Sequence, residues 1–113
     1  MELIDEIEEL IMMHQEGSYW DFKREWYDDS KDGDLLIDII CMANNLVDRD
    51  AYIIIGVNEE CDYAIYDVSQ DANRRNTQML TDFIRGKKFA GDFRPVVTVE
   101  QVHLDGGLVD VIV

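Results

Sequence analysis

Four side chains that could perform metal and phosphate chemistry stand on or next to predicted strands: Glu16, Asp21, Lys23 and Glu59. Two or three carboxylates with open coordination positions suit Mg²⁺ or Mn²⁺, which activate water and stabilise charge on phosphate during phosphodiester hydrolysis. A neighbouring lysine can hold the phosphate or the attacking water. The chain has 25 acidic residues, however, so acids can gather by chance, and Asp21 and Lys23 could equally form a surface ion pair.

The chain must bend for these acids to meet. Glu16 and Asp21 are five positions apart, and a straight strand would place them on opposite faces. Gly17 and Ser18 are suited to supply the bend. Glu59 lies just past the apolar run AYIIIGV, and its carboxylate can reach the same place if that run and the first strand are neighbours. The sequence therefore predicts that the three acids gather at one point.

The surrounding pattern predicts an α+β (mixed α/β) fold: a single domain with a central, mostly antiparallel sheet packed with about three helices. Apolar spacing over 3–11 indicates an amphipathic helix, and alternation over 18–27 indicates a strand with Trp20, Phe22 and Trp26 on its packed face. The other predicted elements are a helix over 35–47 capped by Asp34, a hairpin of strands 51–57 and 63–68, a helix over 73–84, and closing strands over 96–102 and 108–113.

Charge is distributed unevenly along the chain. The formal net charge of −15 argues against simple nucleic-acid binding over the whole surface. Residues 74–94 nevertheless carry six basic residues against two acidic ones, and such a segment can contact phosphates. The same residues could equally be solvated groups that balance an acidic body. The candidate nucleic-acid-binding residues are Arg74, Arg75, Arg85, Lys87, Lys88 and Arg94.

Composition indicates one compact domain in a reducing cytoplasm. The chain has 113 residues, of which 47% are hydrophobic, enough to bury a core without cross-links. Cys41 and Cys61 stand in dissimilar contexts, so we expect neither a disulfide nor a zinc site. No apolar run approaches the roughly 18 residues that span a bilayer, and we expect no membrane partner. The phosphate-binding sequence GxxxxGK[ST] is absent, so no nucleotide cofactor is expected.

The last five residues, VDVIV, read as an apolar strand without a closing turn or polar tail. An exposed strand invites pairing with another strand. We therefore expect either that the domain continues into a longer protein, which we favour, or that a partner covers this end, for example in a homodimer formed through an exposed strand edge.

The segment EGSYWDFKREW resembles the acid-x4-acid-Phe-Lys element of the Schlafen superfamily, whose bacterial members are the AlbA-type domains, named for an expected role in DNA binding and once labelled divergent AAA ATP-binding domains. In that family a helix ending in Ala-Asn follows, and then a strand similar to Tyr-Ile-Ile-Ile-Gly-Val with two acids behind it. DIICMANN and AYIIIGVNEE supply both in order. The resemblance divides the chain into an N-terminal helix at 1–15 and a Schlafen/AlbA-like domain at 16–113.

The resemblance implies a role for each acid. In nuclease-active Schlafens three acids form a metal-dependent RNA-cleaving site, and their positions fall on Glu16, Asp21 and Glu59. Here the second acid is Asp where the family usually has Glu, and the third is Glu where it usually has Asp. Asn58 replaces an acid that often precedes the third one. Each change in side-chain length moves a metal ligand by about one methylene group.

Three functions follow as hypotheses. The net charge and the altered acids favour a nucleic-acid-binding domain, for RNA or DNA, within a larger regulatory or defence protein. The alternative is a metal-dependent RNA or DNA endonuclease in which Glu16, Asp21 and Glu59 bind Mg²⁺ or Mn²⁺ and Lys23 assists at the phosphate. A protein-interaction or oligomerisation module is the third.

Overall fold

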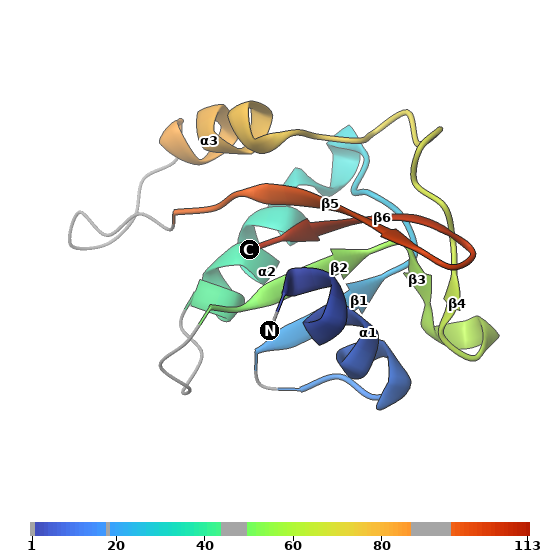
Figure 1. The fold of residues 1–113 in the computed structure, drawn as a ribbon. Coiled ribbons are helices and arrows are strands. Elements are labelled where there is room, and N and C mark those ends of the chain that lie inside the picture. Colours follow the sequence, from blue (N-terminus) through green and yellow to red (C-terminus); the bar gives the residue numbers. More distant parts are fainter. Residues whose placement is uncertain (1, 18, 44–49, 87–95) are drawn as a thin grey trace.

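The computed structural model describes residues 2–17, 19–43, 50–86 and 96–113, which form three layers with helices on both faces of a sheet (Figure 1). The elements are α1 (Leu3–Met12), β1 (Trp20–Lys23), the 3-10 helix η1 (Asp29–Lys31), α2 (Asp32–Ala43), β2 (Tyr52–Ile55), β3 (Val57–Asn58), the 3-10 helix η2 (Glu59–Cys61), β4 (Ala64–Ile65), α3 (Thr77–Arg85), β5 (Val99–Leu104) and β6 (Gly107–Ile112). The four-stranded sheet has the order β1-β2-β6-β5, and only the β1–β2 pair is parallel. The predicted α+β fold is therefore confirmed.

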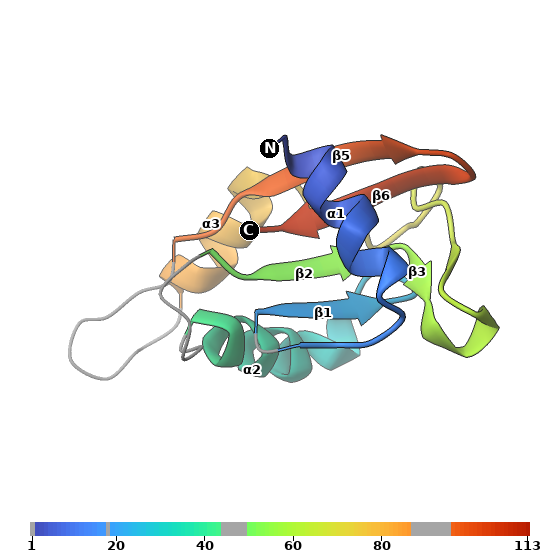
Figure 2. The ribbon, with the colours of Figure 1, turned by 60° about the horizontal axis from the view of Figure 1, so that its bottom comes forward.

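Helix α1 covers one face of the sheet (Figure 2). Its apolar stripe buries Ile7 and Leu10 against strand residues that include Trp20, Phe22 and Ile54. Asp5, Glu8 and Glu9 of α1 are exposed, as expected for an amphipathic helix, whereas Glu6 accepts a hydrogen bond from the Tyr52 hydroxyl of β2 at 2.9 Å. The N-terminal helix thus packs in the same core as the strands of the 16–113 region.

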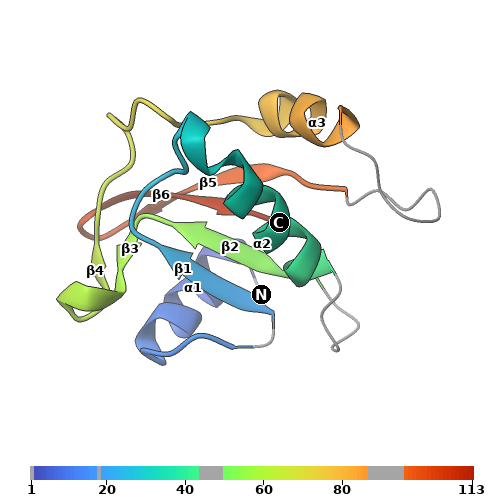
Figure 3. The same ribbon diagram turned by 180° about the vertical axis from the view of Figure 1, so that it is seen from behind.

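Helices α2 and α3 cover the opposite face (Figure 3). Leu35 of α2 and Leu80 of α3 are fully buried, in a second core cluster with Ile53 and Ile55 of β2. Because both faces of β2 are covered, all four of its side chains are buried, as the continuous apolar run in the sequence predicts.

The first two strands and the helix between them form a β-α-β unit. β1 pairs in parallel with β2, and Asp21 lies opposite Ile53 in the register. Parallel neighbours end at the same edge of a sheet. The chain that leaves β1 and the chain that leaves β2 therefore emerge side by side, which the candidate site requires.

The predicted strand over 18–27 is wrong in its second half. β1 ends at Lys23, and Trp26 lies in the core cluster on the α2 and α3 face, opposite to Trp20 and Phe22. The backbone N–H of Trp26 donates to Asp71 at 2.9 Å, so the chain has left the sheet by this point. The apolar alternation in the sequence continues past the end of β1 because Trp26 is also buried, but in the core on the other face of the sheet.

Other predicted boundaries shift as well, and the helix predicted over 73–84 begins at Thr77 as α3. Asp34 does not cap α2, because the helix begins at Asp32 directly after η1, and the side chain that accepts a backbone N–H there is that of Asp28, from Ser30. The predicted strand over 63–68 shortens to β4, which pairs only with β3 in a separate two-stranded hairpin. The apolar strand β2 pairs instead with β1 and β6.

The C-terminal strand lies inside the sheet. β6 is paired on both sides, by β2 and β5, so the expectation that VDVIV is an exposed strand is wrong. The edge strands are β1 and β5, and on the outer side of β5 Val99 exchanges hydrogen bonds with the hydroxyl of Thr77. A homodimer formed through a strand edge stays a prediction. In the described ranges, no helix is both long and apolar enough to cross a bilayer.

Candidate metal centre

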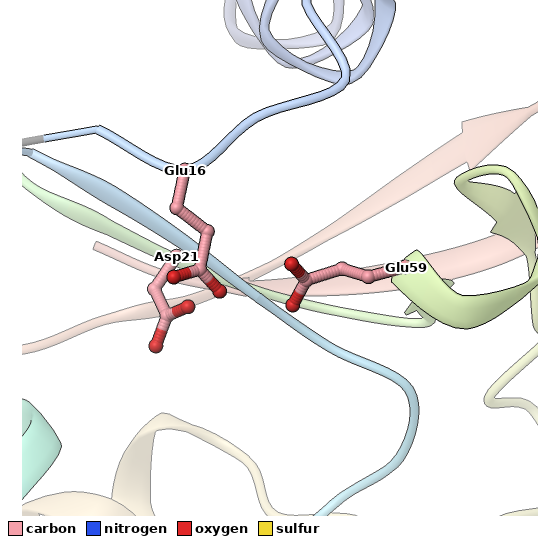
Figure 4. A group of neighbouring side chains, drawn as sticks. All are labelled: Glu16, Asp21 and Glu59. Atoms are coloured by element: carbon pink, nitrogen blue, oxygen red, sulfur yellow. The ribbon is translucent and has the colours of Figure 1, made fainter.

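Three carboxylates converge where the parallel pair β1 and β2 ends. Glu16 comes from the segment between α1 and β1, Asp21 from β1, and Glu59 from the start of η2. One oxygen from each lies within 4.8 Å of the oxygens of the other two. Figure 4 shows the three side chains pointing toward one another. Asp21 is partly buried, whereas Glu16 and Glu59 are exposed, so the cluster is open to solvent on one side.

The predicted bend between Glu16 and Asp21 is present. The N–H of Gly17 donates to the carbonyl of Trp20 at 3.2 Å, and the Trp20 indole N–H donates back to the carbonyl of Gln15 at 2.9 Å. A Cβ atom at Gly17 would lie 2.2 Å from the Trp20 ring. Glycine is therefore required here for space, and its absence of a side chain lets the chain fold back over β1.

Glu59 is positioned by a kink at Gly56. Gly56 has a φ of +119°, in a region that side chains other than hydrogen rarely allow. Its N–H donates to the carbonyl of Lys23 at 2.7 Å, which fixes the exit of β2 to the end of β1. The side chain of Asn58 then accepts the N–H of Glu60 and starts η2. The turn places Glu59 facing Asp21.

The pKa of Asp21 is raised from 3.8 to about 6. Burial is the largest cause, and the hydrogen bond and negative charge of Glu16 add to it, while Lys23 acts in the opposite direction. Two neighbouring carboxylates share a proton when no cation balances them. Asp21 therefore has an electrostatic environment that favours a bound positive charge.

Lys23 lies beside the acids and is held from two sides. Its ammonium nitrogen is 3.6 Å from Asp21 Oδ2 and 3.6 Å from Asp38 Oδ2. Burial lowers the pKa of Lys23, but Asp21 and Asp38 outweigh burial and hold the pKa above its ordinary value. Lys23 therefore stays charged next to the cluster.

Asp38 and Tyr27 are site neighbours that the sequence reasoning missed. The Tyr27 hydroxyl donates to Asp38 Oδ2 at 2.6 Å, and burial together with this hydrogen bond raises the pKa of Tyr27. A signal existed, because Asp38 is the one charged residue between Leu35 and Met42 in an apolar helix, and such a residue needs a partner. The β-α-β arrangement places that helix next to β1.

Of the predicted basic residues that the structure describes, Arg74 and Arg75 are used within the protein and Arg85 is exposed. Arg74 binds the buried Asp110 through two hydrogen bonds, of 2.8 and 2.9 Å. The side chain of Arg75 is 11% exposed and pairs with Asp32. Arg85 is 69% exposed and lies 3.9 Å from Asp82. Lys87, Lys88 and Arg94 lie outside the described residues. Nucleic-acid binding by these six residues stays a prediction, and of the three described arginines Arg85 is the one that presents its charge to solvent.

A family model described as Schlafen, AlbA_2 matches residues 16–113, the part of the chain that supplies all three acids. The chain belongs to the Schlafen AlbA_2 family. Comparisons with curated proteins and with solved structures gave no match. The Schlafen/AlbA resemblance read from the sequence is thereby confirmed, and the family relates the domain to nucleic-acid processes.

The two changes in side-chain length that the Schlafen resemblance implies, at Asp21 and at Glu59, do not separate the acids. The oxygens of Asp21 and Glu59 lie within 4.8 Å of each other and of Glu16.

Two open hollows lie beside Lys23. One, of about 330 Å³, is lined by residues that include Arg24, Asn58 and Glu59. The other, of about 440 Å³, lies toward α2 and its lining includes Lys31 and Asp38. Lys23 lines both hollows, and of the three acids Glu59 lines the first. The lysine therefore borders a space at Glu59 and a space toward α2.

Proposed function

We propose that this Schlafen AlbA_2 domain binds nucleic acid at the cluster of Glu16, Asp21 and Glu59 through a divalent cation, and that it hydrolyses a phosphodiester held there. The observation that carries the proposal is the convergence of three carboxylates within 4.8 Å, contributed by three separate segments of the chain. Acids that lie close together by chance on an acidic surface are not expected to be held in place by a tight turn at Gly17 on one side and a kink at Gly56 on the other.

The residues fit Mg²⁺ or Mn²⁺. All three donors are carboxylate oxygens, which these cations prefer, and the open side of the cluster leaves room for water and phosphate. Burial and the neighbouring Glu16 raise the pKa of Asp21 against the opposing effect of Lys23, and a bound cation would favour the ionised carboxylate. A bound divalent cation supplies Lewis-acid activation of water and stabilises the charge that develops on the phosphate.

Residues of the chain itself hold the phosphate and keep the lysine in position. Lys23 keeps a positive charge beside the two hollows, where it can contact a phosphate oxygen. Asp38, held by Tyr27, keeps the lysine ammonium beside the cluster when the carboxylate of Asp21 is committed to the cation. The hollow lined by Glu59 gives space for the nucleic acid beside the phosphate.

A cleavage assay tests the proposal. Transfer RNA and single-stranded DNA are incubated with the domain in Mg²⁺, in Mn²⁺ and in chelator. We expect cleavage of one or both only with metal, and a loss of at least about 100-fold in Asp21→Asn and Glu59→Gln. Glu60→Gln is the matched control, because Glu60 is the next residue of the same 3-10 helix and lies outside the cluster; its rate should equal that of the wild type.

Other outcomes lead to different functions. Metal-dependent binding without cleavage would leave a nucleic-acid-binding domain that uses the same site. Cleavage that persists in both cluster variants would reveal a contaminating nuclease. If neither nucleic acid binds at low salt, the proposal fails and a protein-interaction role replaces it. Comparison of the two substrates decides between RNA and DNA.

A further inference from the structure

Two aromatic rings join the loops that carry Glu16 and Glu59. The imidazole of His14 stacks on the phenol ring of Tyr63, with centroids 4.7 Å apart and planes inclined by 21°. His14 precedes Glu16 by two residues, and Tyr63 follows Glu59 by four. The end of α1 lies beside the turn at η2 in Figures 1, 2 and 3. We call the stacked pair His14 and Tyr63 the clasp.

The clasp is anchored to the sheet and to the cluster. The ring of Phe22, which lies next to Asp21 in β1, meets the Tyr63 ring edge to face at 5.5 Å. Burial raises the pKa of Tyr63, and the negative charges of Glu59 and Glu16 add to that effect, so the phenol lies close to both acids. One ring thus touches all three segments that supply the carboxylates.

The backbone at the clasp adopts a conformation that its side chains disfavour. Within the described ranges, the non-glycine residues with left-handed backbone are His14, Asp62 and Tyr63, with φ of 51°, 57° and 60°. Single left-handed residues are usually glycine, asparagine or aspartate, so Tyr63, with its bulky ring, is the most unusual of the three. Strained residues of this kind persist where the surrounding structure holds them, and they gather at functional sites. Here His14 and Tyr63 form the stack between the two loops, and Asp62 adjoins it.

A contact needed only for folding would not require this arrangement. The His14 side chain is 48% exposed and the Asp62 side chain 95% exposed, with 3.7 Å between His14 Nδ1 and Asp62 Oδ1. His14 and Asp62 do not fill the core, so little apolar burial depends on them, whereas Tyr63 is half-buried and packs against the core cluster. The clasp instead fixes the distance between the loop that bears Glu16 and the loop that bears Glu59.

We propose that His14 and Tyr63 are positioning residues that hold Glu16 and Glu59 at the spacing a divalent cation requires. This inference rests on the proposed metal site. Without the clasp, the loop before β1 and the turn at η2 can separate, and the cation loses simultaneous access to both acids. Residues that orient metal ligands from behind typically change metal affinity by about 10- to 100-fold when they are replaced.

His14→Gly is the sharpest variant. Glycine accepts the left-handed backbone at this position, so the variant should fold as well as the wild type, while the stacking ring is lost. We expect its Mn²⁺ dissociation constant, measured by calorimetry on the whole chain, to rise about tenfold. Tyr63→Ala should show a similar rise, and Tyr63→Phe, which keeps the ring, should bind as the wild type does. Tyr66→Ala is the matched control, because Tyr66 is an exposed tyrosine three residues further along that contacts Arg24.

Amide hydrogen exchange in chelator supplies a readout that needs no metal. We expect faster exchange over 14–17 and 59–63 in His14→Gly and Tyr63→Ala, with the strands unchanged, and wild-type exchange in Tyr63→Phe. If His14→Gly keeps both the Mn²⁺ affinity and the exchange rates of the wild type, the clasp has no positioning role. If the wild type binds no Mn²⁺, the proposed metal site fails, and the exchange pattern alone then decides whether the clasp joins the two loops.

Discussion

Asp110 and Asp21 are two carboxylates of one sheet with opposite electrostatic surroundings. Asp110 of β6 has no exposed surface, yet both of its oxygens are bound by the guanidinium of Arg74, and Oδ2 also accepts the indole N–H of Trp26 at 2.9 Å. Asp21 is only partly buried, lies against two other acids, and has one cation, Lys23, 3.6 Å away.

The comparison teaches how to distinguish a structural acid from a functional one. A buried charge that is needed only for folding is fully paired, because an unpaired one is too unfavourable. A cluster whose charges remain unbalanced lowers stability, and proteins keep such clusters where function requires them. Asp110 belongs to the first kind, and we infer that Asp21 belongs to the second.

The largest expected effect comes from removing the guanidinium that pairs with the buried Asp110. In Arg74→Met the carboxylate of Asp110 loses its cation while it stays buried, and we expect the free energy of unfolding to fall by about 3 kcal/mol. Urea denaturation followed by tryptophan fluorescence measures the change. Arg85→Met is the control, since Arg85 is 69% exposed, and it should change stability by less than about 0.5 kcal/mol. Equal effects of the two variants would contradict the structural role of Arg74.

The second largest effect comes from adding a divalent cation to the cluster of Glu16, Asp21 and Glu59. A cation that binds the folded protein alone stabilises it by about 2.7 kcal/mol at a concentration 100 times its dissociation constant. We therefore expect Mn²⁺ to raise the melting temperature of the wild type. Asp21→Asn should lose this shift, and Arg74→Met, if it still folds, should keep it. A rise of the same size in Asp21→Asn would place the bound cation elsewhere.

The backbone of the site was predictable, because it follows from spacing. The separation of five positions from Glu16 to Asp21 demands a bend, and Gly17 marks it. The long apolar run of β2 indicates a central strand, and the acid that follows Gly56 must emerge at its end. These inferences use only strand periodicity and glycine, which act locally.

The supporting side chains were not predictable in the same way. The pairing of Asp110 with Arg74 joins positions 36 apart, although a single acid within VDVIV indicates that a buried cation is needed. Contact between Asp38 and Lys23 depends on how α2 is rotated about its axis. The His14–Tyr63 stack depends on left-handed backbone at residues that do not favour it, and no propensity predicts that.

The smallest expected effect is a pH dependence that separates Asp21 from its neighbours. Because the folded protein raises the pKa of Asp21 from 3.8 to about 6, the folded state holds this proton more tightly than the unfolded chain does. The resulting stabilisation is complete below pH 4 and is lost as the pH rises through 6. In chelator, Asp21→Asn lacks this loss of stability. The free energy of unfolding of Asp21→Asn minus that of the wild type should therefore be about 1 kcal/mol larger at pH 8 than at pH 4. This value allows for solvent screening at a partly exposed site.

Glu60→Gln again serves as the control for that measurement, because it removes one negative charge from the same turn without touching the cluster. Its stability difference from the wild type should stay constant between pH 4 and pH 8. If Glu60→Gln gains as much stability at pH 8 as Asp21→Asn does, the general charge of −15 is responsible, and the special environment of Asp21 is refuted. If only Asp21→Asn gains stability relative to the wild type between pH 4 and pH 8, the protein keeps an unfavourable carboxylate at a position where a bound cation would need it.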